Sequence, residues 1–150
     1  MLTLQELSDR AEIQDLIVAE ANAMDRQDWS RWQALFTPDA LIDYSENDGA
    51  KGDPGEVRRW LESVLGRFHS YQHLSSNLEI DFDGDRARVR TLQYIAVKME
   101  TSEGERVVFS GIWFRDEVAR TAEGWRINRR FEELAWRHNF PEDFQPPKAD

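Results

Sequence analysis

The stretch at 78–100, "LEIDFDGDRARVRTLQYIAVKME", alternates apolar and polar residues around an Asp-Gly pair at positions 83–84. Alternation with a period of two is typical of a strand that is buried on one face. Asp-Gly between two such runs is a strong signal for a tight hairpin turn. The stretch therefore predicts two long antiparallel strands.

Two further stretches continue this pattern toward the C-terminus. They read "RVVFSGIWFRDEVAR" at 106–120 and "GWRINRRFEELAWR" at 124–137, and "TAEG" at 121–124 joins them. Gly111 interrupts the first of them and predicts a bend or a bulge. Four successive strands of this kind predict a meandering antiparallel sheet.

The residues before the sheet have helical spacing instead. We expect helices over about 5–26, 28–36 and 54–68, and a short strand at 40–44. Asp28 or Ser30 fits the N-cap of the second helix, and Pro54 fits the first turn of the third. Helices followed by a sheet favour an α+β fold, with the helices packed on one face of a curved sheet.

The overall composition limits the function further. The chain has 150 residues, and its 19 basic and 29 acidic residues give a net charge of −10. This length fits one domain over 1–150, with a Pro-rich tail at about 141–150. The negative charge disfavours nucleic acid and membranes as partners, and the lack of Cys excludes thiolate chemistry. No secretory pattern or long apolar run is found, so we expect a cytoplasmic protein.

Two acidic residues stand at unusual positions in the first predicted helix. Glu20 falls inside the apolar stripe around Ile13, and Asp25 falls on a second apolar edge. A buried charge must be paired, protonated or turned to a wet cavity. Arg130 is a candidate partner for Glu20, and an edge position that reaches solvent is the alternative. For Asp25, the alternative is a solvated helix end.

Three segments together resemble one protein family. They are "EIQDLIVAEANAMDRQDWSRWQALFTPDALIDY" (12–44), "YQHLSSNLEIDFDGDRARVRT" (71–91) and "WFRDEVARTAEGWRINRRF" (113–131). They resemble the SnoaL-like branch of the NTF2-like superfamily, and the resemblance covers about residues 5–137. It implies an α+β cone, in which a curved mixed or antiparallel sheet and the N-terminal helices enclose a deep pocket.

The same resemblance extends to the group of hexachlorocyclohexane dehydrochlorinase, scytalone dehydratase and bile-acid dehydratase. Enzymes of that group carry an Asp–His dyad, and Asp25 and His73 are the matching positions here. Arg130 matches an Arg on the last strand of the dehydrochlorinase. That enzyme has a Lys five residues before its Asp, where this chain has Glu20. Because a carboxylate repels a departing chloride, halide elimination is disfavoured.

An Asp–His pair supports general acid–base chemistry. His changes charge near neutral pH, and a carboxylate bonded to one ring nitrogen fixes its tautomer. The other nitrogen can then remove a proton from carbon and return one to a leaving oxygen. We therefore expect a cofactor-independent, dehydratase-like lyase or isomerase acting on a small hydrophobic or aromatic ring compound. Taken alone, His73 also fits a packed or capping role, and His69 and His138 remain alternatives.

Aromatic residues on the predicted strands suggest an apolar substrate pocket. We expect Tyr44, Tyr94 and Trp113 to line it, with Glu20 and Arg130 as its polar groups. The three His residues have no metal-binding spacing, and no dinucleotide or phosphate-loop motif is found. We therefore expect neither a metal nor a cofactor.

Two other functions on this scaffold remain open. One is a non-catalytic ligand-binding or assembly module, such as a protein that resembles a dioxygenase small subunit. The other is a polyketide cyclase or an epoxide hydrolase. The aromatic residues of "LAWRHNFPEDF" at 134–144 and the family resemblance predict a homo-oligomer, either a trimer or a dimer.

Overall fold

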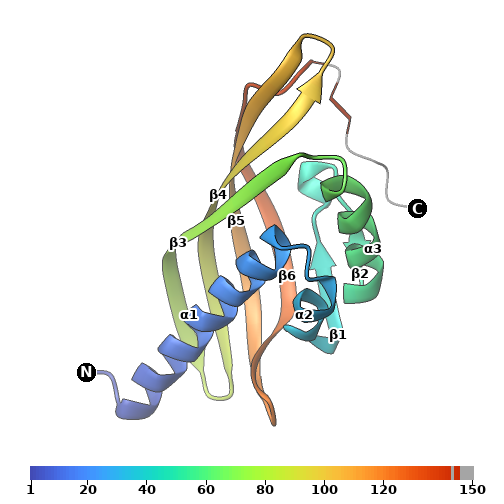
Figure 1. The fold of residues 1–150 in the computed structure, drawn as a ribbon. Helices are drawn as coiled ribbons and strands as arrows, with labels where there is room; N and C mark the ends of the chain where they lie inside the picture. Colours follow the sequence, from blue (N-terminus) through green and yellow to red (C-terminus); the bar gives the residue numbers. More distant parts are fainter. Residues whose placement is uncertain (143, 146–150) are drawn as a thin grey trace.

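A computed structural model describes residues 1–142, 144 and 145 of the chain. Its elements in chain order are α1 (Leu4–Asp25), α2 (Trp29–Ala34), β1 (Phe36–Asp43), the 3-10 helix η1 (Ser45–Asn47), β2 (Lys51–Gly52), α3 (Pro54–Leu65), β3 (Ser70–Asp83), β4 (Arg86–Thr101), β5 (Gly104–Thr121) and β6 (Gly124–His138). The helices precede the long strands (Figure 1), which confirms the predicted α+β class. The predicted tail lies partly outside the described residues.

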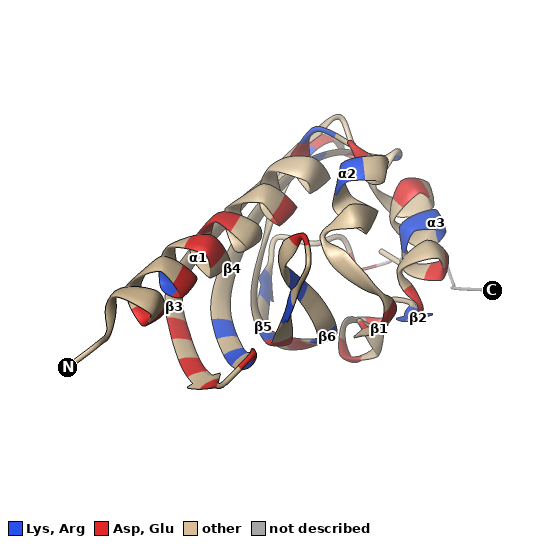
Figure 2. Ribbon diagram, turned by 90° about the horizontal axis from the view of Figure 1, so that it is seen from below, with Lys and Arg blue, Asp and Glu red and all other residues tan. Residues whose placement is uncertain are grey.

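All six strands form one sheet in the order β2-β1-β6-β5-β4-β3. Neighbouring strands are antiparallel except β1 and β6, which run parallel, so the sheet is mixed. Seen from below in Figure 2, the sheet curves round from β3 beside α1 to β1 and β2 beside α3. The face that carries the helices is called the inner face below, and the opposite face is the outer face.

The hairpins form where the sequence predicts them. Gly84 follows β3 with a φ of 60°, a left-handed conformation that glycine adopts without strain. The predicted irregularity at Gly111 is a bulge, because the pairing of β5 with β6 shifts between Gly111 and Ile112. Trp136 of β6 packs over Gly111, and a side chain at this position would clash with the indole.

Each of the three α-helices begins at a side-chain cap. Thr3 forms a capping box with Glu6 at the start of α1, and Asp53 forms one with Glu56 at the start of α3. Asp28 caps α2 by accepting a hydrogen bond from the backbone of Arg31 at 3.1 Å. The second helix is shorter than expected, because the backbone from Phe36 onward pairs with β6.

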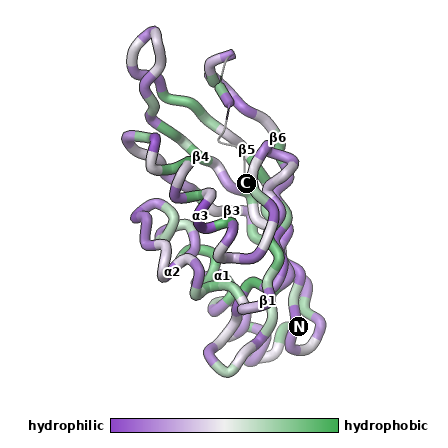
Figure 3. Tube along the Cα trace, turned by 90° about the vertical axis from the view of Figure 1, so that its right-hand side faces the viewer, coloured by the Kyte–Doolittle hydropathy of each residue, from purple (hydrophilic) through white to green (hydrophobic). Residues whose placement is uncertain are grey.

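Successive side chains along each strand point to opposite faces of the sheet. On β5, Val108, Ile112 and Phe114 are buried on the inner face, whereas Val107 is exposed on the outer face. Apolar residues continue from the core into the β4–β5 hairpin, which extends beyond the rest of the sheet and has a hydrophilic tip (Figure 3). Within the described part of the chain, no helix is long and apolar enough to cross a membrane.

Candidate active site

Asp25 and His73 meet where the end of α1 crosses the start of β3. His73 Nδ1 lies 2.6 Å from Asp25 Oδ1, and the backbone N–H of His73 donates to the same carboxylate at 3.1 and 3.2 Å. The His73 side chain is 9% exposed and that of Asp25 is 23% exposed. Because the carboxylate accepts from Nδ1, the free ring nitrogen is Nε2.

Neighbouring contacts hold these two elements in register. The Tyr71 hydroxyl donates to the backbone oxygen of Met24 at 3.2 Å, next to Asp25 in the chain. The Tyr71 ring also meets the His73 ring edge-on, with 6.0 Å between centroids. The chain then reverses, and the Asp28 N–H donates to the Ala23 oxygen at 2.9 Å. The carboxylate is therefore oriented by packing as well as by its hydrogen bonds.

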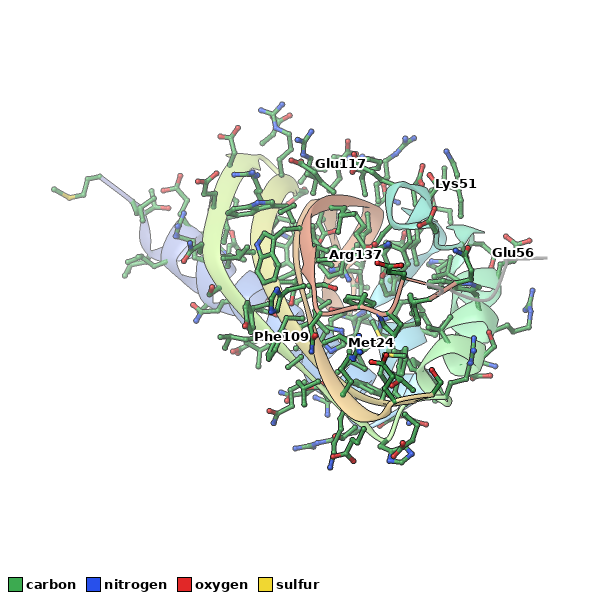
Figure 4. The ribbon with its side chains drawn as sticks, turned by 90° about the horizontal axis from the view of Figure 1, so that it is seen from above. Met24, Lys51, Glu56, Phe109, Glu117 and Arg137 are labelled. Atoms are coloured by element: carbon green, nitrogen blue, oxygen red, sulfur yellow. The ribbon has the colours of Figure 1, made fainter. Side chains whose placement is uncertain are left out.

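His73 opens onto a cavity of about 130 Å³ between the inner face, α3 and the C-terminal segment. Apolar side chains dominate its lining, among them Met24, Leu61, Ile95, Ile112, Phe114 and Phe140. Met24 and Arg137, two lining residues, lie toward the middle of the view from above in Figure 4, whereas Glu117 and Lys51 lie at its edge. Among the described residues, His73 Nε2 has no hydrogen-bond partner.

Glu132 of β6 also lines this cavity and is 7% exposed. Burial raises the pKa of Glu132 to about 7, although the Asn47 side chain and the charges of Arg130, His73 and Arg137 act in the opposite direction. A carboxyl group with this pKa can donate or accept a proton near neutral pH.

A fully buried charge network lies beside the cavity. Arg130 donates to Asp116 through Nε and Nη2, each at 2.8 Å, and its Nη1 lies 2.8 Å from Glu20 Oε1. Trp32 Nε1 donates to the same Glu20 oxygen at 2.8 Å. Burial raises the pKa of Asp116, whereas the carboxylates of Asp116 and Glu20 outweigh burial and hold the pKa of Arg130 well above its usual value.

The expected pocket residues therefore separate into three groups. Tyr44 lines the cavity, and burial raises the pKa of its hydroxyl. Glu20 and Arg130 do not line it, because they are held in the network, where Glu20 has the partner proposed from sequence. The expectation for Tyr94 and Trp113 is also wrong. Both lie on the outer face, where Tyr94 packs on Trp136 and Trp113 packs under the Arg90 guanidinium.

The other two His residues lie away from the cavity. His138 packs against Phe109 with 6.3 Å between ring centroids. His69 is exposed beside Glu100 and Glu105. Among the described residues, these three form the only cluster of three or more His, Asp or Glu side chains whose ligand atoms lie close enough together to hold a metal. One of its carboxylates is already paired with a lysine, because Lys98 Nζ lies 2.8 Å from Glu105.

Sequence reasoning missed Glu132 although a signal for it was present. Residues two apart on a strand share a face, so an inward Arg130 implies an inward Glu132. The burial pattern of β6 follows this rule, since residues 130 and 132 are both buried. Asn47 and Ser110, which also line the cavity, carry no comparable signal in the sequence.

The family model of the SnoaL-like domain matches residues 5–131. The chain belongs to the SnoaL-like family. An uncharacterized protein of Mycobacterium tuberculosis is 39% identical to this SnoaL-like chain over 132 residues, which cover 88% of the chain and 89% of that protein. The likeness extends over nearly the whole of both proteins.

Two solved structures show that this SnoaL-like chain has the NTF2-like cone fold. The hexachlorocyclohexane dehydrochlorinase LinA-type3 of Novosphingobium barchaimii superposes with a TM-score of 0.78 at 20% identity, covering 96% of this chain and 99% of that one. A candidate scytalone dehydratase of Novosphingobium aromaticivorans also has a TM-score of 0.78, at 21% identity, covering 96% and 93%. At these identities, the two similarities establish the fold and not the reaction.

Proposed function

We propose that this protein is a cofactor-independent lyase or isomerase that acts on a small hydrophobic ring compound. One observation carries the proposal. His73 Nδ1 lies 2.6 Å from Asp25, and the same ring lines a mainly apolar cavity. An imidazole held in one tautomer beside an apolar cavity is a proton-transfer group that can reach a bound substrate.

In this proposal, Asp25 orients the ring and stabilises the imidazolium that forms during the reaction. His73 Nε2 removes a proton from a substrate carbon next to an activating carbonyl. The same proton can leave with a departing oxygen, which gives elimination of water, or return to another carbon, which gives isomerisation. Neither reaction requires a metal or an organic cofactor.

The cavity favours a substrate with one ring. Its volume is about 130 Å³, slightly below the roughly 150 Å³ of an apolar cavity that holds benzene, so it leaves no room for a second ring. The similar solved structures include a dehydrochlorinase and a candidate dehydratase by name, and these names support an elimination. Glu20 is held in the buried charge network and does not line the cavity, so its carboxylate does not repel a chloride leaving group on a bound substrate.

The test uses 3-hydroxycyclohexanone, a one-ring β-hydroxy ketone whose dehydration gives the ultraviolet-absorbing enone 2-cyclohexenone. We expect wild-type protein to accelerate enone formation and His73→Ala to abolish the acceleration. His69→Ala is the matched control, because His69 is exposed and outside the cavity. Circular dichroism would verify that each variant is folded. Undiminished turnover by folded His73→Ala would refute the assignment.

A ligand carrier is the second candidate, and the narrow cavity is the observation that favours it. Ligand sites usually occupy about 300–1,000 Å³, more than this cavity offers. A carrier predicts that 2-cyclohexenone binds, as measured by calorimetry, while wild-type protein and His73→Ala both leave the rate of dehydration at its uncatalysed value.

A further inference from the structure

Glu132 is a buried carboxyl group without a cation of its own. Its two candidate cations on β6 are occupied, because Arg130 is held by Asp116 and Glu20. Arg137 donates to the backbone oxygen of Asn47 at 3.1 Å and also to the Asn47 side chain. None of the ion pairs among the described residues includes Glu132.

The other charged or titratable groups that face Glu132 are His73 from β3 and the Tyr44 hydroxyl after β1. The cavity residues of α3, β4 and β5 are all uncharged, for example Leu61, Ile95 and Ser110. The environment therefore favours the neutral acid, and a pKa of about 7 leaves its proton available for transfer.

Glu132 and His73 reach the cavity from different strands of the inner face. Strands β4 and β5 separate β6 from β3 in the sheet, and uncharged side chains from both of these strands line the same cavity. A substrate in this cavity therefore lies between a base and an acid. Pairs of titratable groups with different environments on two sides of a site are a common arrangement for acid–base catalysis.

We propose that Glu132 is a second catalytic residue, a general acid that protonates the leaving oxygen of a β-hydroxy carbonyl substrate while His73 removes the proton from carbon. This inference rests on the proposed function and deepens it, because it divides between two residues the two transfers that His73 could perform alone. It also names the substrate class: the leaving group is a hydroxyl, which requires a proton to depart.

In a β-hydroxy ketone, the two residues act on the two ends of the bond that becomes the double bond. His73 Nε2 takes the proton of the carbon next to the carbonyl, and the C–H electron pair becomes the new carbon–carbon double bond. The bond from carbon to the hydroxyl oxygen breaks with its electron pair on oxygen. That oxygen takes the Glu132 proton and departs as water. The imidazolium then returns its proton to the Glu132 carboxylate through the released water.

This division predicts that the effect of Glu132 depends on the leaving group. A hydroxyl is a poor leaving group without a proton, whereas chloride departs without one. Removing the acid should therefore slow loss of water and leave loss of chloride unchanged. Removing the base should slow both reactions, because both begin with loss of the same proton.

The experiment compares two probes, 3-hydroxycyclohexanone and 3-chlorocyclohexanone, which both give 2-cyclohexenone. We expect Glu132→Gln to lower kcat/KM for the hydroxy probe by about 10²–10⁴-fold, the usual contribution of a general acid. We expect less than about a threefold change for the chloro probe. Glu117→Gln is the matched control, because Glu117 lies on β5 outside this cavity, with its side chain 52% exposed.

The outcomes separate this inference from the proposed function. Equal losses on both probes, or none, in folded Glu132→Gln would overturn the role of Glu132 while leaving that of His73 intact. Full activity of His73→Ala, or no wild-type turnover of either probe, would overturn the proposed function and this inference with it. A second readout is the pH profile: the wild-type rate with the hydroxy probe should fall as pH rises above about 7, and this fall should be absent with the chloro probe.

Discussion

Asp25 and Glu132 are two carboxyl groups beside one cavity, and their hydrogen bonds give them different roles. The Asp25 carboxylate accepts hydrogen bonds from both the backbone N–H and the ring Nδ1 of His73, so two donors stabilise its negative charge. Glu132 is 7% exposed and has no ion pair among the described residues, so burial favours its neutral form. The residue type is thus compatible with either role, and the surroundings decide between them.

Asp25→Asn tests the orienting role. The amide keeps the shape of the side chain but can no longer stabilise an imidazolium, and it can hold the wrong tautomer. We expect turnover of the hydroxy and chloro probes to fall by about 10²–10⁴-fold. Asp15→Asn on the exposed face of α1 is the control and should retain full activity. A loss smaller than about threefold for Asp25→Asn would contradict the role.

Glu132→Gln should also change how stability depends on pH. The folded-state pKa of Glu132 is raised from 4.5 to about 7. In the wild type, the unfolded chain therefore loses this proton at lower pH than the folded protein. The contribution of Glu132 to stability is complete below about pH 4.5 and is lost as pH rises through about 7.

In a comparison of the two proteins, the free energy of unfolding of Glu132→Gln should rise relative to wild type by roughly 3 kcal/mol between pH 4.5 and 7.5. Urea denaturation at several pH values measures this difference. A constant difference over the whole range would show that Glu132 titrates normally.

At the scale of elements, Arg130 connects parts of the chain that are far apart in sequence. It binds Asp116 of β5 and Glu20 of α1, and Glu20 in turn accepts from Trp32 of α2. The Arg130 guanidinium also packs 3.8 Å from the centre of the Phe114 ring. This network fixes α1 and α2 against the sheet, and thereby the end of α1 where Asp25 lies.

Arg130→Met should destabilise the protein by about 3–5 kcal/mol, because it leaves two buried carboxyl groups without their cation. Arg129→Met is the control: Arg129 lies on the outer face and its only described carboxylate partner, Glu117, is 3.9 Å away. We expect a change within about 0.5 kcal/mol for the control. Chemical denaturation checks both values, and equal effects would contradict the account of the network.

At the level of the whole molecule, the outer face carries large apolar side chains that are exposed to solvent in the monomer. Leu74, Tyr94 and Trp136 are 63%, 40% and 43% exposed, and Tyr94 lies 5.7 Å from Trp136 and 5.8 Å from Phe109 between ring centroids. Leu74 pairs with Tyr94 across neighbouring strands, so the residues form one patch. Such patches are typical of interfaces between proteins.

We therefore predict that the protein forms a homo-oligomer through this patch. Size-exclusion chromatography with light scattering should give the mass of a dimer or a trimer for wild type. Tyr94→Glu should shift it toward the monomer, because a charge would be buried in the contact. Asp81→Asn, an exposed change elsewhere on the sheet, should not. A monomeric wild type would contradict the prediction.

Local periodicity and turn chemistry were enough to predict the three α-helices before four long strands, the hairpin at Gly84 and the irregularity at Gly111, but they did not predict η1 or β2. There was also reason to expect a partner for Glu20, since a charge in an apolar stripe requires one. Asp25 and His73 were singled out by resemblance to a family, and their catalytic role stays a prediction.

Which side chains share the cavity depends on how the strands and helices pack in three dimensions. Tyr94 and Trp113 look like pocket residues in the sequence, yet they point to the outer face, because one position along a strand reverses the side of the sheet. Glu132 became a candidate acid through burial among residues from all three layers of the cavity wall, namely the helices, the sheet and the C-terminal segment, which no local pattern encodes. Periodicity is a property of neighbouring residues, whereas a pKa depends on everything packed around the group.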